Sequence, residues 1–204
     1  MKSAFIFGNG GHANVVASIL KSSHKQIYFI DKSPPSDGVI NEVDFFNEIE
    51  KYKNQEVFLG IGSNKIRTSI YQKLINAGVT PSNCISKHSF IAHDAKLGNG
   101  VVICPGSIVG SKAIIGDNTI INTMSSVDHD CVLGDNSQIT CGVTFGGNVI
   151  VGKNCFFGLK SAVIPGINIG DNAIVMAGSI VVNDVPQKVM VGGNPAQIIE
   201  RKSN

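Results

Sequence analysis

Large apolar residues recur at every sixth position from Ile85 to Val181 without a slip in phase. Four residues after each of them, the occupant is mostly small or β-branched, as at Ser107, Ala113 and Thr119. A period of six with one large and one small inward residue predicts a flat strand and a turn, repeated as the sides of a triangular prism. Three hexads make one coil, so the series predicts about five to six coils stacked over roughly 27 Å. The large positions are Ile85, Ile91, Leu97, Ile103, Val109, Ile115, Ile121, Val127, Leu133, Ile139, Phe145, Val151, Phe157, Val163, Ile169, Val175 and Val181.

Glycine occupies the position after the large apolar residue in many of these hexads. Because glycine suits sites where the backbone turns, it marks the corners of the predicted prism. A β-sandwich is the alternative, but its strands would be separated by hairpin signals at irregular intervals. We therefore predict a parallel β-helix of hexapeptide repeats from residue 85 to residue 204. The corner glycines are Gly98, Gly110, Gly116, Gly134, Gly146, Gly152, Gly158 and Gly170.

The first 84 residues instead alternate short apolar stretches with segments of helical spacing. This alternation predicts a small parallel sheet of βαβ type, similar to part of a Rossmann fold. The chain thus divides into an α/β domain at residues 1–84 and a β-helix domain at residues 85–204, whose tail VGGNPAQII is expected to cap the prism. The predicted strands are Ala4–Phe7, Gln26–Ile30 and Glu56–Ile61, and the predicted helices are Ala13–Lys21, Asp44–Tyr52 and Lys65–Ala77.

A glycine-rich loop, GNGGH, joins the first predicted strand to the first predicted helix. Backbone N–H groups and the helix dipole can hold a phosphate at such a place. The loop lacks the third glycine of a full GxGxxG fingerprint, which favours a nucleotide-sugar pyrophosphate over a nicotinamide cofactor. Asp31 ends the second predicted strand and can accept hydrogen bonds from a ribose or a uracil. A structural turn followed by a solvated acid is the alternative. The candidate nucleotide-sugar residues are Gly8, Gly10, Gly11, His12 and Asp31.

His129 lies at a predicted corner of the prism with its side chain outward, because Val127 and Cys131 take the inward positions of its hexad. One coil later the same corner holds Gly147, so no bulky side chain stands over the imidazole. Histidine suits general base catalysis near neutral pH, since its unperturbed pKa is about 6.5, and Asp130 could orient the ring. Neighbouring residues of an extended chain face opposite ways, so that contact requires a turn. An exposed histidine beside a solvated acid is the alternative.

Composition and charge narrow the classes of function. Lys and Arg total 17 and Asp and Glu total 15, so the formal charge of +2 provides no field of the kind that binds nucleic acid or an anionic membrane. No apolar run approaches the roughly 18 residues of a membrane span, and the five cysteines show no CxxC pairing. We therefore expect free thiols and a cytoplasmic protein.

The histidines raise zinc chemistry as an alternative, because three imidazoles can bind a catalytic zinc ion. His88 and His93 lie close in the sequence, and His129 follows two coils after His93. In hexapeptide-repeat carbonic anhydrases, the first two zinc-binding histidines are far apart in the sequence and the last two are close. Here the close pair, His88 and His93, comes first. We expect surface histidines and no metal.

The GNGGHANVV loop, the VDHDCVLGD hexads and the VGGNPA tail together resemble the bacterial NeuD/PglD-type sugar acetyltransferases. The resemblance covers essentially the whole chain. It implies a left-handed β-helix, a handedness that periodicity cannot supply because crossovers between parallel strands are normally right-handed. It further implies a homotrimer, with acetyl-CoA in the groove between adjacent prisms and the sugar nucleotide on the N-terminal domain.

By the same resemblance, His129 is the base that removes a proton from the sugar amine, and Asp130 is its partner. The backbone N–H of Gly147 is expected to stabilise the oxyanion of the tetrahedral intermediate. The residues implied near the acetyl group or the pantetheine arm are Asn122, Gln138, Gly147, Leu159 and Ala177.

The implied reaction is N-acetylation of a UDP-4-amino-4,6-dideoxy sugar, as in bacillosamine synthesis. O-acetylation of sialic acid and N-acetylation of a GDP-linked sugar such as perosamine are close alternatives. A catalytically idle sugar-nucleotide-binding module, which would bind without turnover, is an alternative of another class.

Overall fold

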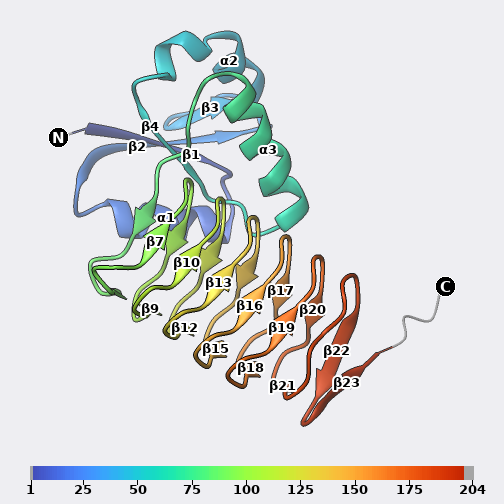
Figure 1. Cartoon of the computed structure of the whole chain (residues 1–204). Helices are drawn as coiled ribbons and strands as arrows, with labels where there is room; N and C mark the ends of the chain where they lie inside the picture. The colour runs from blue at the N-terminus through green and yellow to red at the C-terminus, as the bar shows by residue number, and fades with distance from the viewer. Residues whose placement is uncertain (1, 200–204) are drawn as a thin grey trace. The chain divides into compact units, whose positions relative to one another are not determined.

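The computed structural model describes residues 2–199, and the chain divides into two compact units, Met1–Ser86 and Lys87–Asn204. The first unit is an α/β unit, and the second is a prism of short parallel strands (Figure 1). The predicted fold class, a Rossmann-like sheet followed by a left-handed β-helix, is confirmed.

The first unit is built on a parallel sheet of order β3-β2-β1-β4. Its strands are β1 (Lys2–Phe7), β2 (His24–Asp31), β3 (Val39–Asn41) and β4 (Glu56–Leu59). The sequence did not predict β3, because a strand of three residues is too short to show an apolar pattern. All three of its residues are half-buried. The unit ends with β5 (Cys84–Ile85), where Ile85 is 41% exposed although the hexad series predicted an inward position. β5 is the edge strand of its sheet and leaves Ile85 exposed, so that prediction was wrong.

Three α-helices complete this unit: α1 (Gly11–Leu20), α2 (Glu42–Asn47) and α3 (Asn64–Asn76). The predicted helix Asp44–Tyr52 is in fact α2 followed by the 3₁₀ helix η1 (Ile49–Tyr52). α2 begins early because the Asn41 side chain accepts a hydrogen bond from the Val43 N–H at 2.9 Å, which caps the helix. Within residues 2–199 no helix is long and apolar enough to cross a bilayer; α3, with 13 residues, falls short of the roughly 20 required.

The second unit stacks mostly two-residue strands into three sheets, and the strands from β6 to β22 pair in parallel with the strand one coil away. One sheet has the order β19-β16-β13-β10-β7, the second β21-β18-β15-β12-β9-β6, and the third runs from β8 through β11, β14, β17 and β20 to β22. The antiparallel pair β22 and β23 closes the series at the expected capping segment. The strands are β6 (Phe90–Ile91), β7 (Lys96–Leu97), β8 (Val102–Ile103), β9 (Ile108–Val109), β10 (Ile114–Ile115), β11 (Ile120–Ile121), β12 (Ser126–Val127), β13 (Val132–Leu133), β14 (Gln138–Ile139), β15 (Thr144–Phe145), β16 (Ile150–Val151), β17 (Phe156–Phe157), β18 (Ala162–Val163), β19 (Asn168–Ile169), β20 (Ile174–Val175), β21 (Ile180–Val181), β22 (Met190–Gly193) and β23 (Ala196–Ile198).

The hexad residues form the core of the prism. Every sixth residue from Ile103 to Val181 is 3% exposed or less, as the periodicity predicted. Burying one such side chain stabilises the fold by about 1.5–3 kcal/mol, so the repeated core is the main source of stability in this unit. Ile167 stands four positions after Val163, where most hexads have a smaller residue, and it is only 8% exposed.

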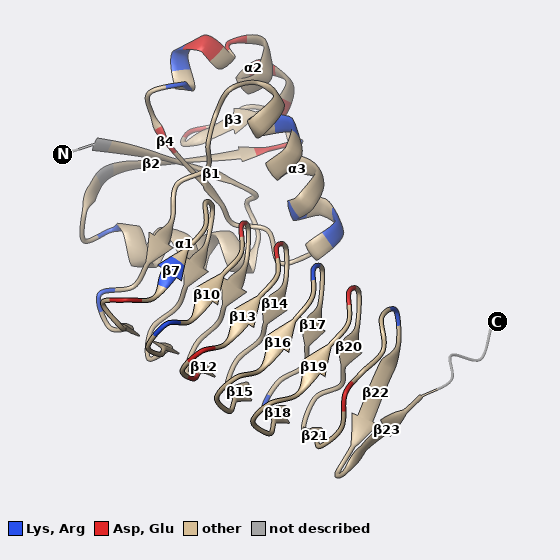
Figure 2. Ribbon diagram, viewed as in Figure 1, with Lys and Arg blue, Asp and Glu red and all other residues tan. Residues whose placement is uncertain are grey.

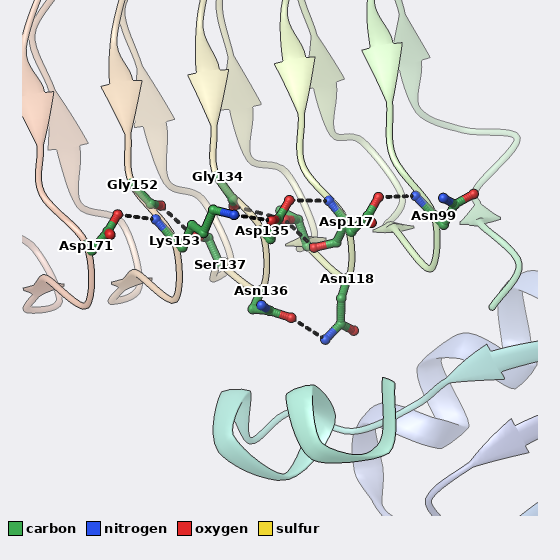
Figure 3. A network of polar contacts seen from close by, with 11 residues as sticks. Asn99, Asp117, Asn118, Gly134, Asp135, Asn136, Ser137, Gly152, Lys153 and Asp171 are labelled. Carbon is green, nitrogen blue, oxygen red and sulfur yellow. Dashed lines mark hydrogen bonds and ion pairs between the residues drawn. The ribbon is translucent and has the colours of Figure 1, made fainter. Parts of the chain in front are cut away.

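Charged residues lie at the turns of the β-helix, and Lys96 on β7 is the exception among its strands (Figure 2). At one corner the carboxylates join successive coils (Figure 3). Asp117 accepts the backbone N–H of Asn99 at 2.8 Å, and Asp135 accepts that of Asp117 at 3.0 Å. Asp171 accepts the backbone N–H of Lys153 at 2.8 Å. These bonds satisfy amide groups that point along the stack and tie each coil to the next.

Candidate active site

A cavity of about 950 Å³ opens within the α/β unit. The loop Gly8–His12, the end of β2 at Asp31, the segment Gly60–Ser63 and the first turns of α3 line it. All five residues predicted to contact a nucleotide sugar therefore lie on one cavity. Its volume is in the usual range for a pocket that holds a small organic ligand.

Glycines shape this cavity in two ways. Gly8 has φ of +99°, and a Cβ there would lie 2.9 Å from the Gly60 carbonyl oxygen. A Cβ on Gly60 would lie 2.7 Å from the Ala13 Cα, so β1, β4 and α1 approach closely only because both residues are glycine. Gly10 and Gly11, in contrast, face open space on the cavity side. Their missing side chains leave room for a ligand against the backbone.

The N-terminus of α1 faces this cavity without a side-chain cap, since Gly10 is the capping residue and the first turn holds no acid. Such a terminus offers unpaired N–H groups and a partial positive charge to an anion. His12 follows directly. Burial, and then the charge of Arg67, lower the pKa of His12 to about 4, so its ring is neutral near pH 7.

The cavity carries charges of both signs. Lys32, Lys65 and Lys73 line it together with the acids Asp31 and Glu42. The Glu42 carboxylate pairs with Lys73 at 2.9 Å. The Asp31 carboxylate accepts the Ser33 hydroxyl at 2.6 Å and the Ser33 N–H at 3.0 Å, and these bonds lower the pKa of Asp31. Basic residues on α3 are visible in Figure 2.

His129 and Asp130 form a hydrogen-bonded pair at a corner of the β-helix. The Nδ1 atom of His129 lies 2.9 Å from Oδ2 of Asp130, and the side chains are 52% and 42% exposed. The contact between sequence neighbours is possible because Asp130 has φ of 57°, in the left-handed region. A carboxylate only accepts, so Nδ1 carries the hydrogen, and in the neutral ring Nε2 is left as the basic nitrogen.

Glycines on the adjacent coils allow this corner to pack. A Cβ on Gly147 would lie 2.5 Å from Nε2 of His129 and 3.0 Å from Nδ1, so the imidazole occupies the room that this glycine leaves. On the coil before, a Cβ on Gly110 would lie 2.7 Å from the His129 backbone nitrogen. The Asp128 carboxylate accepts the His129 N–H at 2.7 Å, which further fixes the corner.

The residues predicted to contact acetyl-CoA do not meet His129 within one chain. Asn122, Leu159 and Ala177 lie on the corner between the β11/β17/β20 sheet and the next sheet. Gln138 lies on β14 of the same sheet. His129 follows β12, one prism face further on, where of this set only Gly147 is beside it.

The sequence patterns did not indicate some of the residues that line the cavity, notably Glu42, Gly60, Ser63, Lys65 and Lys73. The sequence GIGSN, directly between a strand and a helix, carries the same signal as GNGGH and could have indicated part of this wall. No group of three or more His, Cys, Asp or Glu side chains able to hold a metal occurs among residues 2–199. All five cysteines are free thiols.

Family models match both units. Residues 3–74 match the PglD N-terminal domain, and residues 148–182 match the hexapeptide repeat of succinyl-transferase. A PglD N-terminal domain joined to hexapeptide coils is the arrangement of a hexapeptide-repeat acyltransferase, and the chain is an enzyme of this class.

Solved structures resemble the chain over its length. PerB from Caulobacter crescentus, in complex with CoA and GDP-perosamine, is 33% identical with a TM-score of 0.90, and 98% of each chain is covered. The acetyltransferase domain of PglB from Neisseria gonorrhoeae, in complex with acetyl coenzyme A, is 26% identical with a TM-score of 0.91, covering 97% of this chain and 99% of that chain. The chain belongs to the NeuD/PglD-type family of sugar acetyltransferases.

Proposed function

We propose that this enzyme transfers an acetyl group from acetyl-CoA to the 4-amino group of a nucleotide-linked amino-deoxy sugar. The observation that carries the proposal is the His129–Asp130 pair, whose geometry leaves Nε2 as a base on an exposed corner. An amine nucleophile must lose a proton during acyl transfer, and a positioned imidazole performs this step well. No covalent acyl-enzyme is required.

In the proposed mechanism, Nε2 of His129 accepts the proton as the sugar amine attacks the thioester carbonyl. The Asp130 carboxylate holds the ring in the productive tautomer and stabilises the imidazolium that forms. The tetrahedral intermediate then collapses, the carbon–sulfur bond breaks, and the CoA sulfur leaves and takes up the proton. The Gly147 N–H, which donates to no group among the described residues, is our candidate for stabilising the oxyanion.

The acceptor sugar nucleotide is assigned to the cavity of the α/β unit. The uncapped N-terminus of α1 and the open faces of Gly10 and Gly11 suit a pyrophosphate that approaches the backbone closely. Lys32 and Lys65 add positive charge on the cavity wall. The Asp31 carboxylate remains an acceptor for a ribose hydroxyl or a base N–H.

The active form is proposed to be a homotrimer in the cytoplasm. Asn122, Leu159 and Ala177 lie one prism face away from His129, so a single chain does not gather the whole predicted set. A neighbouring copy that places its Asn122 corner beside His129 would complete a groove for acetyl-CoA. Gel filtration with light scattering tests this assembly, and a monomer with full activity would contradict it.

The two candidate acetyl acceptors differ in the nucleotide that carries the sugar. The UDP-4-amino-4,6-dideoxy sugar of bacillosamine synthesis is the first candidate. GDP-perosamine is the second, because PerB, whose structure holds GDP-perosamine, is 33% identical to this chain.

The test is acetyl transfer with purified protein. Acetyl-CoA is mixed with each sugar nucleotide and with sialic acid, thiol release is followed, and mass spectrometry identifies the acetylated product. His129→Ala should lose at least about a hundredfold in kcat, because the base that accepts the amine proton is removed. Full activity in His129→Ala would remove the mechanism, and binding without turnover would indicate an idle module.

A further inference from the structure

Arg67 is a fully buried cation in α3, with no exposed surface. Its Nη1 donates to the carbonyl oxygens of Ile61 at 3.2 Å and Gly62 at 3.4 Å, and its Nη2 donates to Oδ1 of Asn64 at 2.9 Å. Burial lowers its pKa to about 10, so the side chain is still charged near pH 7. Burial of a charged side chain opposes folding, and the proposed acetyl transfer gives Arg67 no role that would explain its burial.

The hydrogen bonds of Arg67 fix one wall of the cavity. Ile61 and Gly62 belong to the segment Gly60–Ser63, which lies between β4 and α3 and lines the cavity. One arm of the planar guanidinium contacts both carbonyl groups and the other contacts Asn64, an orientation that a lysine ammonium would fix less firmly. The buried Arg67 side chain therefore holds this wall of the cavity in place.

The charge of Arg67 also acts on His12, which lines the same cavity. The Nε2 atom of His12 is buried and has no hydrogen-bond partner within the described part of the chain. Such an atom in a native protein calls for an explanation, and a ligand in the cavity supplies one. Burial is the larger cause of the lowered pKa of His12, and the positive charge of Arg67 is the second; both favour the neutral imidazole. The other charged groups on the cavity are Asp31, Lys32, Glu42, Lys65 and Lys73.

We propose that Arg67 is a positioning residue for the nucleotide diphosphate, acting through the Gly60–Ser63 wall and through the His12 ring. The inference rests on the proposed function, because the cavity must be the sugar-nucleotide site. Arg67 does not touch the reacting amine. The buried charge of Arg67 attracts the pyrophosphate, its Nη1 holds the Gly60–Ser63 wall, and the neutral His12 ring accepts a hydrogen bond from the ligand or donates one to it.

The test compares Arg67→Met and Arg67→Lys with the unchanged protein. Calorimetry measures binding of GDP and UDP, and NMR follows the His12 ring protons with pH, assigned by loss of the signal in His12→Gln. Arg67→Met should raise the His12 midpoint by about one pH unit and weaken nucleotide binding about tenfold. Arg67→Lys should keep the low midpoint, since it keeps the charge, and still weaken binding. Lys51→Met, an exposed change on η1, controls for the loss of one positive charge.

The outcomes separate the two proposals. If the unchanged protein binds neither GDP nor UDP, the proposed function fails and the inference fails with it. If it binds one of them, and folded Arg67→Met and Arg67→Lys bind it equally tightly with His12 titrating as before, the role of Arg67 is overturned while the function stands. If Arg67→Met does not fold, Arg67→Lys decides: binding as tight as in the unchanged protein overturns the inference.

Discussion

Gly147→Ala tests whether the position of the imidazole controls catalysis. A Cβ at residue 147 would lie 2.5 Å from Nε2 of His129, where ordinary contact begins near 3.4 Å. The ring must therefore move by roughly 1 Å, and a displacement of that size costs about a hundredfold in rate, or about 2.7 kcal/mol of transition-state stabilisation. Because the ring is half exposed, it can swing outward, and the loss in folding stability should stay below about 1 kcal/mol.

The assay is steady-state acetyl transfer, with circular dichroism melting as a check on folding. The matched control is a double-mutant cycle with His129→Ala. Once the imidazole is gone, the added methyl group has nothing to displace, so Gly147→Ala should cause no further loss in that background. Two results would refute the reasoning: nearly full activity in Gly147→Ala, or a second hundredfold loss in the double mutant.

Three further changes test other parts of the structure. Lys112→Gly should raise the free energy of unfolding by about 1 kcal/mol in urea denaturation, because Lys112 has φ of 57°; a loss of stability would count against this account. Gly11→Ala should leave the melting temperature unchanged yet weaken GDP or UDP binding about tenfold, since its methyl group meets only open cavity; unaltered binding would contradict the site. Iodoacetamide at about pH 8 should alkylate half-buried Cys141 before Cys104 and Cys155, because burial raises the pKa of those two thiols to about 12 and about 11. Peptide mass mapping gives the order of alkylation, and earlier labelling of Cys104 or Cys155 would contradict this prediction.

The prism could be predicted from the sequence because its signal is local and repeated. One large residue in six defines the inward side, and three hexads define the coil, so the placement of Gly147 beside His129 followed from counting alone. The contact between His129 and Asp130 could not be predicted from the spacing of the hexads. It depends on a left-handed backbone at Asp130, which the many asparagines at equivalent corners, such as Asn136 and Asn148, indicate only in retrospect.

The cavity was harder to predict, because it forms where segments distant in sequence come together. Gly60 lines it only because β4 pairs in parallel with β1, and single-chain periodicity contains no such register. Arg67 gave no signal either, since an arginine in a helix normally faces water. Its burial depends on carbonyl groups that a loop presents to it.

The pairing of the β-helix strands with the strands one coil away has a consequence for how such a protein can change in length. Insertion or removal of a full coil leaves each later side chain on the face it already occupied, so the column grows or shortens with its edges aligned. Loss of a single hexad would rotate everything beyond it by one face. Length variation among viable variants should therefore come in steps of three hexads, which makes the coil, rather than the strand, the unit of change.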